Sequence, residues 1–229
     1  MKQIVKMVLL SCCIFSFLMV NGCSKKEENK KEQITEEPKE KTQLIENQQY
    51  TSPLNPTENQ ILAYNDLSAA VEKEDNKEEA KQVAISFVYD FFTLSNKKSA
   101  EDIGGLQFIP SNKVATFMQY AKSYYYSNYS TIVNEYGKEN LPEVDQVSVE
   151  SMEEAQLDFG KFTNSGYIIK LKVTYKENKL PQEALKTNMT LRISNFEDFL
   201  YDRSVDYTKD PLVLKQETYQ MCWRVLGVE

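Results

Sequence analysis

The sequence contains no histidine and only four cysteines, three of which lie within the first 23 residues. Histidine is the commonest general base and the commonest metal ligand, so serine–histidine triads, cysteine–histidine dyads and zinc sites of the usual composition are excluded. Cys222 is the one cysteine left for a fold beyond residue 23, so no intramolecular disulfide is expected there. The pair Gly104–Gly105 lacks the third glycine and the lysine of a phosphate-binding loop. We therefore expect no catalytic residue, no metal and no cofactor.

Clustered basic residues are also missing. The formal net charge is −7, and it becomes −9 if residues 1–22, with their two lysines and no acidic residue, are removed. Phosphate binding depends on clustered Lys and Arg side chains. Nucleic acid is therefore not an expected partner.

The first 22 residues have the pattern of a secretory signal. Lys2 and Lys6 precede an apolar run over residues 7–20, which Ser11 and Ser16 interrupt. A membrane-spanning helix needs about 20 predominantly apolar residues, so this run is too short to span comfortably. We expect residues 1–22 to be cleaved.

Residues 20–23, Val-Asn-Gly-Cys, resemble the lipobox of bacterial lipoproteins, with Cys23 at the position of the invariant cysteine. The resemblance implies that a diacylglycerol is attached to the Cys23 thiol and that the bond before Cys23 is then cut. Two or three acyl chains are enough for stable anchoring. An ordinary cleaved signal is the alternative. We expect a chain anchored to the membrane by lipid and facing outside the cytoplasm.

Residues 23–57 are rich in Lys and Glu, include Pro53 and Pro56, and contain few apolar residues. Such a segment cannot bury enough surface to offset its conformational entropy. Its mixed charges also argue against strong adhesion to anionic lipid. We expect a disordered polar tether before a folded domain over residues 58–229.

The first half of this domain shows helical patterns. Thr57 and Gln60 form a capping box before one helix, and Asn76 and Glu79 form another before the main core helix. That helix has apolar residues at steps of three and four: Ala80, Val83, Ala84, Phe87, Val88 and Phe91. A third helical stretch begins near Asn112 and ends at Gly137. Its expected apolar face holds Val114, Phe117, Met118, Ala121 and Tyr125.

After Pro142 the apolar period changes to two, which predicts strands near residues 147–149, 167–175, 189–193 and 219–225. In the last strand, Tyr219, Met221, Trp223 and Val225 are expected on the packed face, and Cys222 and Arg224 on the polar face. Helices followed by strands predict an α+β fold, with the helices packed on a curved antiparallel sheet of about four strands.

This element order over residues 76–229 resembles the nuclear transport factor two-like, or cystatin-like, roll. The resemblance rests on the order of elements and on no diagnostic motif. It implies a cone between the main helix and the sheet, which holds a ligand in enzymatic members and is filled or used for docking in others. Fold alone does not determine function.

Five tyrosines are the candidate binding residues, because tyrosine supplies rigid contact area with a polar end. These residues are Tyr120, Tyr124, Tyr125, Tyr126 and Tyr129. The alternative, which we favour, is that most of them pack into the core with their hydroxyls at the surface.

Two further features are weighed against simpler explanations. Tyr89 and Asp90 invite comparison with ketosteroid isomerases of the same roll, but a solvated aspartate is the preferred interpretation. Cys222 has only Arg224 as a local activating group, so we expect a half-buried, inert thiol. The sequence thus predicts a non-catalytic binding or assembly module for another protein of the cell envelope. The alternatives are a small-molecule or histidine-free enzyme site inside the cone, and a passive spacer or shield.

Overall fold

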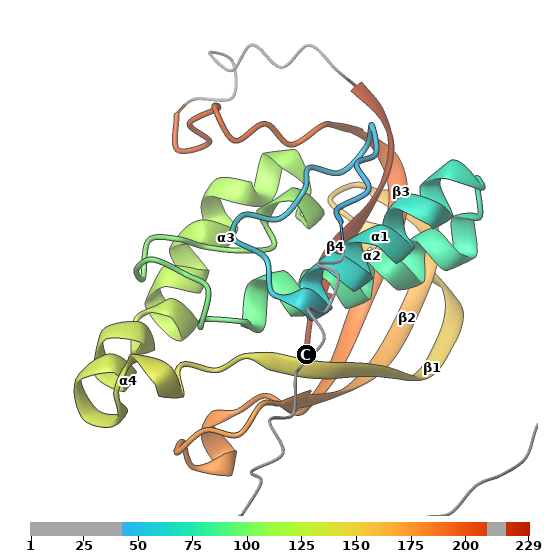
Figure 1. Cartoon of the computed structure of the whole chain (residues 1–229). Coiled ribbons are helices and arrows are strands. Elements are labelled where there is room, and N and C mark those ends of the chain that lie inside the picture. The colour runs from blue at the N-terminus through green and yellow to red at the C-terminus, as the bar shows by residue number, and fades with distance from the viewer. Residues whose placement is uncertain (1–42, 210–218) are drawn as a thin grey trace, which may run out of the picture. The chain divides into compact units, whose positions relative to one another are not determined.

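The computed structural model describes residues 43–209 and 219–229 (Figure 1). These residues belong to one compact unit that comprises residues 41–229. The predicted signal, Cys23 and the tether up to residue 42 lie outside the described residues. Within the described part, no helix is long and apolar enough to cross a membrane.

Two helices form an adjacent pair at the start of the domain. Helix α1 (Glu58–Glu72) begins at the predicted capping box, in which the Thr57 hydroxyl accepts from the Gln60 N–H and the Gln60 side chain accepts from the Thr57 N–H. Helix α2 (Asn76–Phe92) is capped by the Asp75 side chain, which accepts from the Glu78 N–H. The predicted box at Asn76 was therefore wrong by one residue, although the helix begins where expected.

The connection from α2 to the sheet is built of short helical pieces. Residues 106–136 contain 3₁₀ turns, helix α3 (Val114–Ala121), a π-helical segment (Lys122–Tyr126) and helix α4 (Asn128–Tyr136). The stretch ends at Gly137, as predicted, where the positive φ of +91° favours glycine. Val114 and Ala121 of the predicted apolar face are buried, and its other three members pack half-buried against the core.

The sheet has four antiparallel strands in the order β1-β2-β3-β4. The helical first half and this sheet confirm the predicted α+β fold. The strands are longer than the alternation indicated, and Figure 1 shows β1 and β2 bending around the helices. Their bounds are Val144–Phe159, Phe162–Tyr175, Asn188–Phe199 and Tyr219–Val228.

Helix α2 is the core helix that the sequence predicts, because it contacts all four strands while α1 packs mainly on α2. The side chains between α2 and the sheet belong to one hydrophobic cluster. Those from α2 and from the centre of the sheet are at most 6% exposed: Val83, Phe87, Val88, Phe91, Ile169, Leu171, Val173, Leu191 and Ile193. These side chains fill the space between α2 and the centre of the sheet.

The predicted tether, residues 23–57, includes residues that belong to the folded domain. Residues 43–57 lie against α1 and β4, and Tyr50 is 2% exposed in the main core. The Gln49 side chain donates to the Met221 carbonyl, and the Tyr64 hydroxyl donates to the Tyr50 carbonyl. The segment has few apolar residues, but one buried tyrosine and these long-range hydrogen bonds attach it to the domain.

The alternation predicted for β4 holds over half of the strand. Trp223 and Val225 are buried as expected, whereas Tyr219 and Met221 are exposed. Arg224, on the predicted polar face, is also buried, and its guanidinium pairs with Asp198 of β3. The pattern of a single strand does not report such a partner.

Candidate functional site

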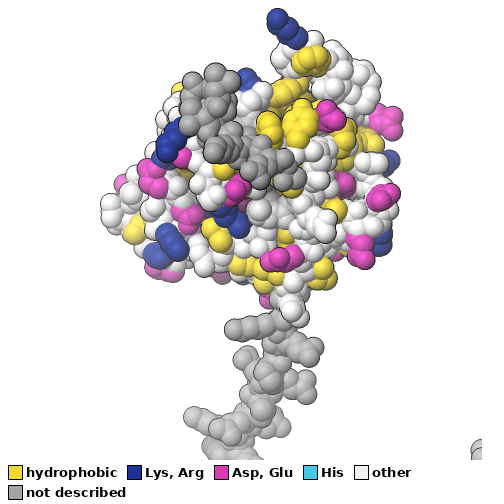
Figure 2. Space-filling view, turned by 90° about the horizontal axis from the view of Figure 1, so that it is seen from above, with side chains coloured by type: hydrophobic (Ala, Val, Ile, Leu, Met, Phe, Trp, Pro, Cys, Tyr) yellow, Lys and Arg dark blue, Asp and Glu magenta, His cyan; other side chains and the backbone are white. Residues whose placement is uncertain are grey.

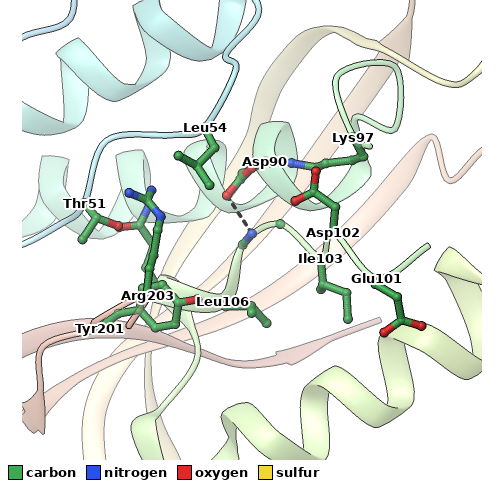
Figure 3. A pocket seen from close by; sticks show the side chains of 13 residues that line it. Thr51, Leu54, Asp90, Lys97, Glu101, Asp102, Ile103, Leu106, Tyr201 and Arg203 are labelled. Atoms are coloured by element: carbon green, nitrogen blue, oxygen red, sulfur yellow. Dashed lines mark hydrogen bonds and ion pairs between the residues drawn. The ribbon is translucent and has the colours of Figure 1, made fainter. Parts of the chain in front are cut away.

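A polar hollow of about 250 Å³ lies beside the C-terminal end of α2 (Figure 3). Its walls come from residues 51–54, 101–107 and 201–203, together with Asp90 and Lys97. We call it the loop pocket. Charged side chains from separate segments line it.

Asp90 is bound within the wall of the loop pocket. Its Oδ1 accepts from the Lys97 ammonium at 2.8 Å, and its Oδ2 accepts from the Gly105 N–H at 2.7 Å, the bond drawn in Figure 3. The Lys97 side chain is only 5% exposed, so the ion pair is largely shielded from water. The interpretation of Asp90 as a solvated residue is therefore wrong. Its carboxylate neutralises a buried lysine and binds the loop that contains Gly104 and Gly105, which we call the glycine loop.

The remaining charged groups of the loop pocket also have partners. Glu101 forms an ion pair with Lys122, and Arg203 donates to the Ser52 carbonyl. The Asp102 carboxylate accepts from the Lys98 N–H at 2.9 Å. These contacts join the three segments to each other and to the helices, so the loop pocket has the character of a structural junction.

Tyr126 adds to this junction by connecting the glycine loop to the end of α2. Its hydroxyl donates to the Phe91 carbonyl at 2.9 Å and accepts from the Gly104 N–H at 2.8 Å. Burial raises the pKa of Tyr126 well above its ordinary value, because the anionic form would be desolvated. Tyr126 is a neutral anchor for the loop, not a contact residue for a ligand.

The five candidate tyrosines divide between core and surface. The hydroxyl of half-buried Tyr125 donates to the Phe92 carbonyl at 3.0 Å, and that of buried Tyr129 donates to the Lys97 carbonyl at 3.1 Å. Tyr120 and Tyr124 are 60% and 70% exposed, with ring centroids 4.6 Å apart. The structure thus leaves an exposed aromatic pair and uses the other three for packing.

Tyr89 and Asp90 are not part of one site. The Tyr89 hydroxyl donates to the Asp145 carbonyl at 3.3 Å, while Asp90 binds Lys97 and Gly105. Successive helical residues point about 100° apart, which explains why these neighbours face different partners. No tyrosine–carboxylate pair of the isomerase kind forms here.

A second group of polar residues, which sequence reasoning missed, is buried at the edge of β4. The Tyr50 hydroxyl donates to Glu79 Oε1 at 2.8 Å and accepts from the Trp223 N–H at 3.2 Å. Arg224, 1% exposed, donates through Nε to Asp198 Oδ2 at 2.8 Å. We call these residues the β4-edge cluster: Tyr50, Glu79, Asp198 and Arg224.

Further hydrogen bonds complete the β4-edge cluster. The Ser111 N–H donates to Asp198, and Arg224 Nη2 donates to the Phe199 carbonyl at 3.0 Å. Cys222 is fully buried beside the cluster, and burial raises the pKa of its thiol. A protonated, inaccessible thiol is unreactive, so the expectation of an inert cysteine agrees with the structure, although Cys222 is more deeply buried than predicted.

The Glu79 carboxyl gives a pH-dependent prediction. Burial raises its pKa above the ordinary 4.5, against hydrogen bonds from Tyr50 and Gln49 and the charge of Arg224. The folded chain therefore binds this proton more tightly than the unfolded chain, so stability is greatest below pH 4.5 for this group and is lost as pH rises through the folded pKa.

Glu79→Gln keeps an acceptor for Tyr50 and removes this ionisation. Urea unfolding of the variant and of the unchanged chain should show similar stabilities at pH 4 and a gain of at most about 1 kcal/mol for the variant at pH 7. A variant less stable than the unchanged chain at pH 7 would show that the Glu79 charge stabilises the fold through Arg224.

No known protein family, curated protein or solved structure matches this chain. The lipobox and the roll therefore remain resemblances in sequence pattern and element order. Among residues 43–209 and 219–229, no group of three Cys, Asp or Glu side chains is arranged to hold a metal ion. The site must therefore be judged on its own geometry.

Proposed function

We propose that this chain is an extracytoplasmic lipoprotein, anchored to the cell membrane through Cys23, and that its folded domain is a non-catalytic binding module for another protein of the cell envelope. The observation that carries the proposal is the exposed pair Tyr120 and Tyr124. Exposed tyrosines whose rings contact each other at a tilt of 34° resemble the aromatic contacts that dominate protein interfaces.

The packing of the interior supports binding at the surface. The side chains between α2 and the centre of the sheet belong to one hydrophobic cluster, and on the other side of α2 the hollow beside α1 and Phe108 measures only about 10 Å³. That volume is near the lower limit for a single water molecule. A small-molecule or enzyme site, the alternative, would therefore have to lie away from the centre of the sheet, where a hollow of about 410 Å³ is lined by Tyr167 and Trp223.

The surface itself offers apolar contact area. In the view from above, hydrophobic side chains gather in the upper part of the face and again along its lower edge, with acidic and basic side chains spread around them (Figure 2). Exposed aromatic residues also occur near the tip of the β1–β2 hairpin and at the start of β4, where Phe162 is 73% and Tyr219 is 54% exposed. Apolar patches of this kind mark contact surfaces.

Photo-crosslinking in the cells that naturally produce the chain tests this proposal. A photoreactive residue at position 120 or 124 should trap one discrete protein, whereas the same residue at Thr131, exposed on α4, should not. Position 126 is unsuitable because Tyr126 is buried. Cys23→Ser should abolish the adduct, because without the lipid the chain leaves the membrane.

A blank result from both tyrosine positions, in cells where the chain is present at its normal level, would contradict the proposal. It would favour the alternative of a passive spacer or shield. An adduct that persists in the Cys23→Ser variant would instead separate the binding role from the membrane anchor.

A further inference from the structure

The two edges of the sheet differ in how they are covered. At β4, the side chains of Gln49 and Tyr50 bind the backbone of Met221 and Trp223. Strand β1 pairs with β2 on one side, and among the described residues no backbone segment pairs with its other side beyond Asp145. A strand edge of this length presents a row of free N–H and C=O groups that can accept another strand.

The open edge carries charge of one sign. Strand β1 contains no Lys or Arg, and its acidic residues are all exposed: Asp145, Glu150, Glu153, Glu154 and Asp158. In the part of the chain that the structure describes, none of them takes part in an ion pair.

The strand register explains the missing ion pairs. Glu153, Glu154 and Asp158 lie opposite Ile168, Tyr167 and Thr163 of β2, while the lysines of β2 lie opposite serines. Two copies of this chain paired through β1 would bring acidic side chains together, which is unfavourable. The negative charge of this edge therefore disfavours pairing with a second copy of the chain and favours pairing with a basic strand.

A hollow of about 410 Å³ lies on the sheet beside the same stretch of β1. Glu154 and Gln156 line it together with Ser165 and Tyr167 of β2, and Trp223 of β4 forms its end wall. The rings of Tyr167 and Trp223 have centroids 5.5 Å apart. We call it the inner-sheet hollow.

The inner-sheet hollow is suited to a cation. Its lining includes a carboxylate and two aromatic rings but no Lys or Arg. Burial is the largest cause of the raised pKa of Tyr167, and the nearby carboxylates of Glu154 and Asp75 raise it further. The negative charge around this ring therefore comes both from β1 and from the residue before α2. Aromatic faces beside carboxylates attract ammonium and guanidinium groups.

We propose that the open edge of β1 binds an extended, basic segment of a partner protein, which joins the sheet as a fifth strand and places a Lys or Arg side chain in the inner-sheet hollow. Backbone hydrogen bonds to β1 supply affinity, and the acidic side chains supply selectivity. The proposal rests on the binding role proposed above only in requiring a protein partner; its surface does not include Tyr120 or Tyr124.

Peptide binding to the chain over residues 23–229, with Cys23→Ser, tests the proposal. A ten-residue peptide of alternating Lys and Thr should bind at 50 mM salt, and its twin of alternating Glu and Thr should bind at least 30-fold more weakly. Methylation of all backbone nitrogens in the Lys peptide should abolish binding, because it removes the ladder donors on both edges. Hydrogen exchange should show new protection in β1.

Charge-reversal variants locate the site. Glu153→Lys with Glu154→Lys should weaken binding of the Lys peptide at least tenfold and should allow the Glu peptide to bind. The matched control is Glu177→Lys with Glu183→Lys, at two exposed positions between β2 and β3, which should change binding less than twofold. Should the reversed variant fail to fold, Glu153→Gln with Glu154→Gln gives the same comparison.

Equal binding of the methylated and unmethylated Lys peptides would overturn the proposal, because it would show simple attraction between opposite charges. Equal weakening by the control variant would do the same. Either result would leave crosslinking at Tyr120 and Tyr124 unaffected, so failure at this edge is distinguishable from failure of the proposed function.

Discussion

Asp198→Ala should lower the free energy of unfolding by about 3–5 kcal/mol, because it leaves the buried Arg224 guanidinium without its counter-ion. The arginine is 1% exposed and cannot regain water without moving β4. The truncation also removes the acceptor for Ser111, which connects the segment before α3 to the sheet. Urea unfolding at pH 7 measures the effect.

Two control variants separate the buried charge from the loss of a carboxylate. Asp66→Ala, on the exposed side of α1, should change stability by less than about 0.5 kcal/mol. Asp198→Leu combined with Arg224→Met should recover more than half of the loss, because a buried ion pair replaced by apolar residues is often neutral. A loss below 1 kcal/mol for Asp198→Ala would mean that water reaches Arg224 in solution.

Gly104→Ala should destabilise the domain by about 3 kcal/mol, because a β carbon at this position would lie 2.1 Å from the Asp90 carbonyl oxygen. That oxygen belongs to the backbone of α2, so the clash cannot be relieved by a side-chain rotation. The loop must move, which breaks the hydrogen bonds from Gly104 to Tyr126 and from Gly105 to Asp90. Thermal unfolding followed by circular dichroism measures the change.

Gly160→Ala is the matched control, because nothing lies within 4 Å of a β carbon at the tip of the β1–β2 hairpin. Its φ of +66° still costs about 1 kcal/mol for alanine. If both variants lose the same stability, the loop around Gly104 is free to move, and the junction at the loop pocket is weaker than its hydrogen bonds indicate.

The elements that could be predicted are those whose signals are local. The capping box at Thr57, the apolar face of α2 and the alternation in β2 and β3 each lie within one turn or one strand. Hydrogen-bonding and burial requirements within such short segments act on neighbouring residues, so the sequence displays them. The order of helices before strands then predicts the α+β class.

Predictions failed where a residue's environment is supplied by a distant segment. Tyr50 was assigned to a tether because its neighbours in sequence are polar, yet its hydroxyl contacts Glu79 and the backbone of Trp223, 173 residues away. A solvated Asp90 is the preferred expectation because aspartate is mostly exposed in proteins, but Lys97 and Gly105 of the following loop bind its carboxylate. No periodicity records such contacts.

By itself the sequence predicts an extracytoplasmic location, excludes histidine chemistry and determines the type and order of the elements, because these depend on composition and on spacings of a few residues. Only the tertiary structure decided which polar residues are buried together, which two tyrosines stay exposed and which sheet edge stays open. Those outcomes depend on contacts between distant parts of the chain, such as Asp198 with Arg224 and Gln49 with Met221. Such contacts contribute to the free energy of folding only once the segments are packed together, so local sequence patterns do not reveal them.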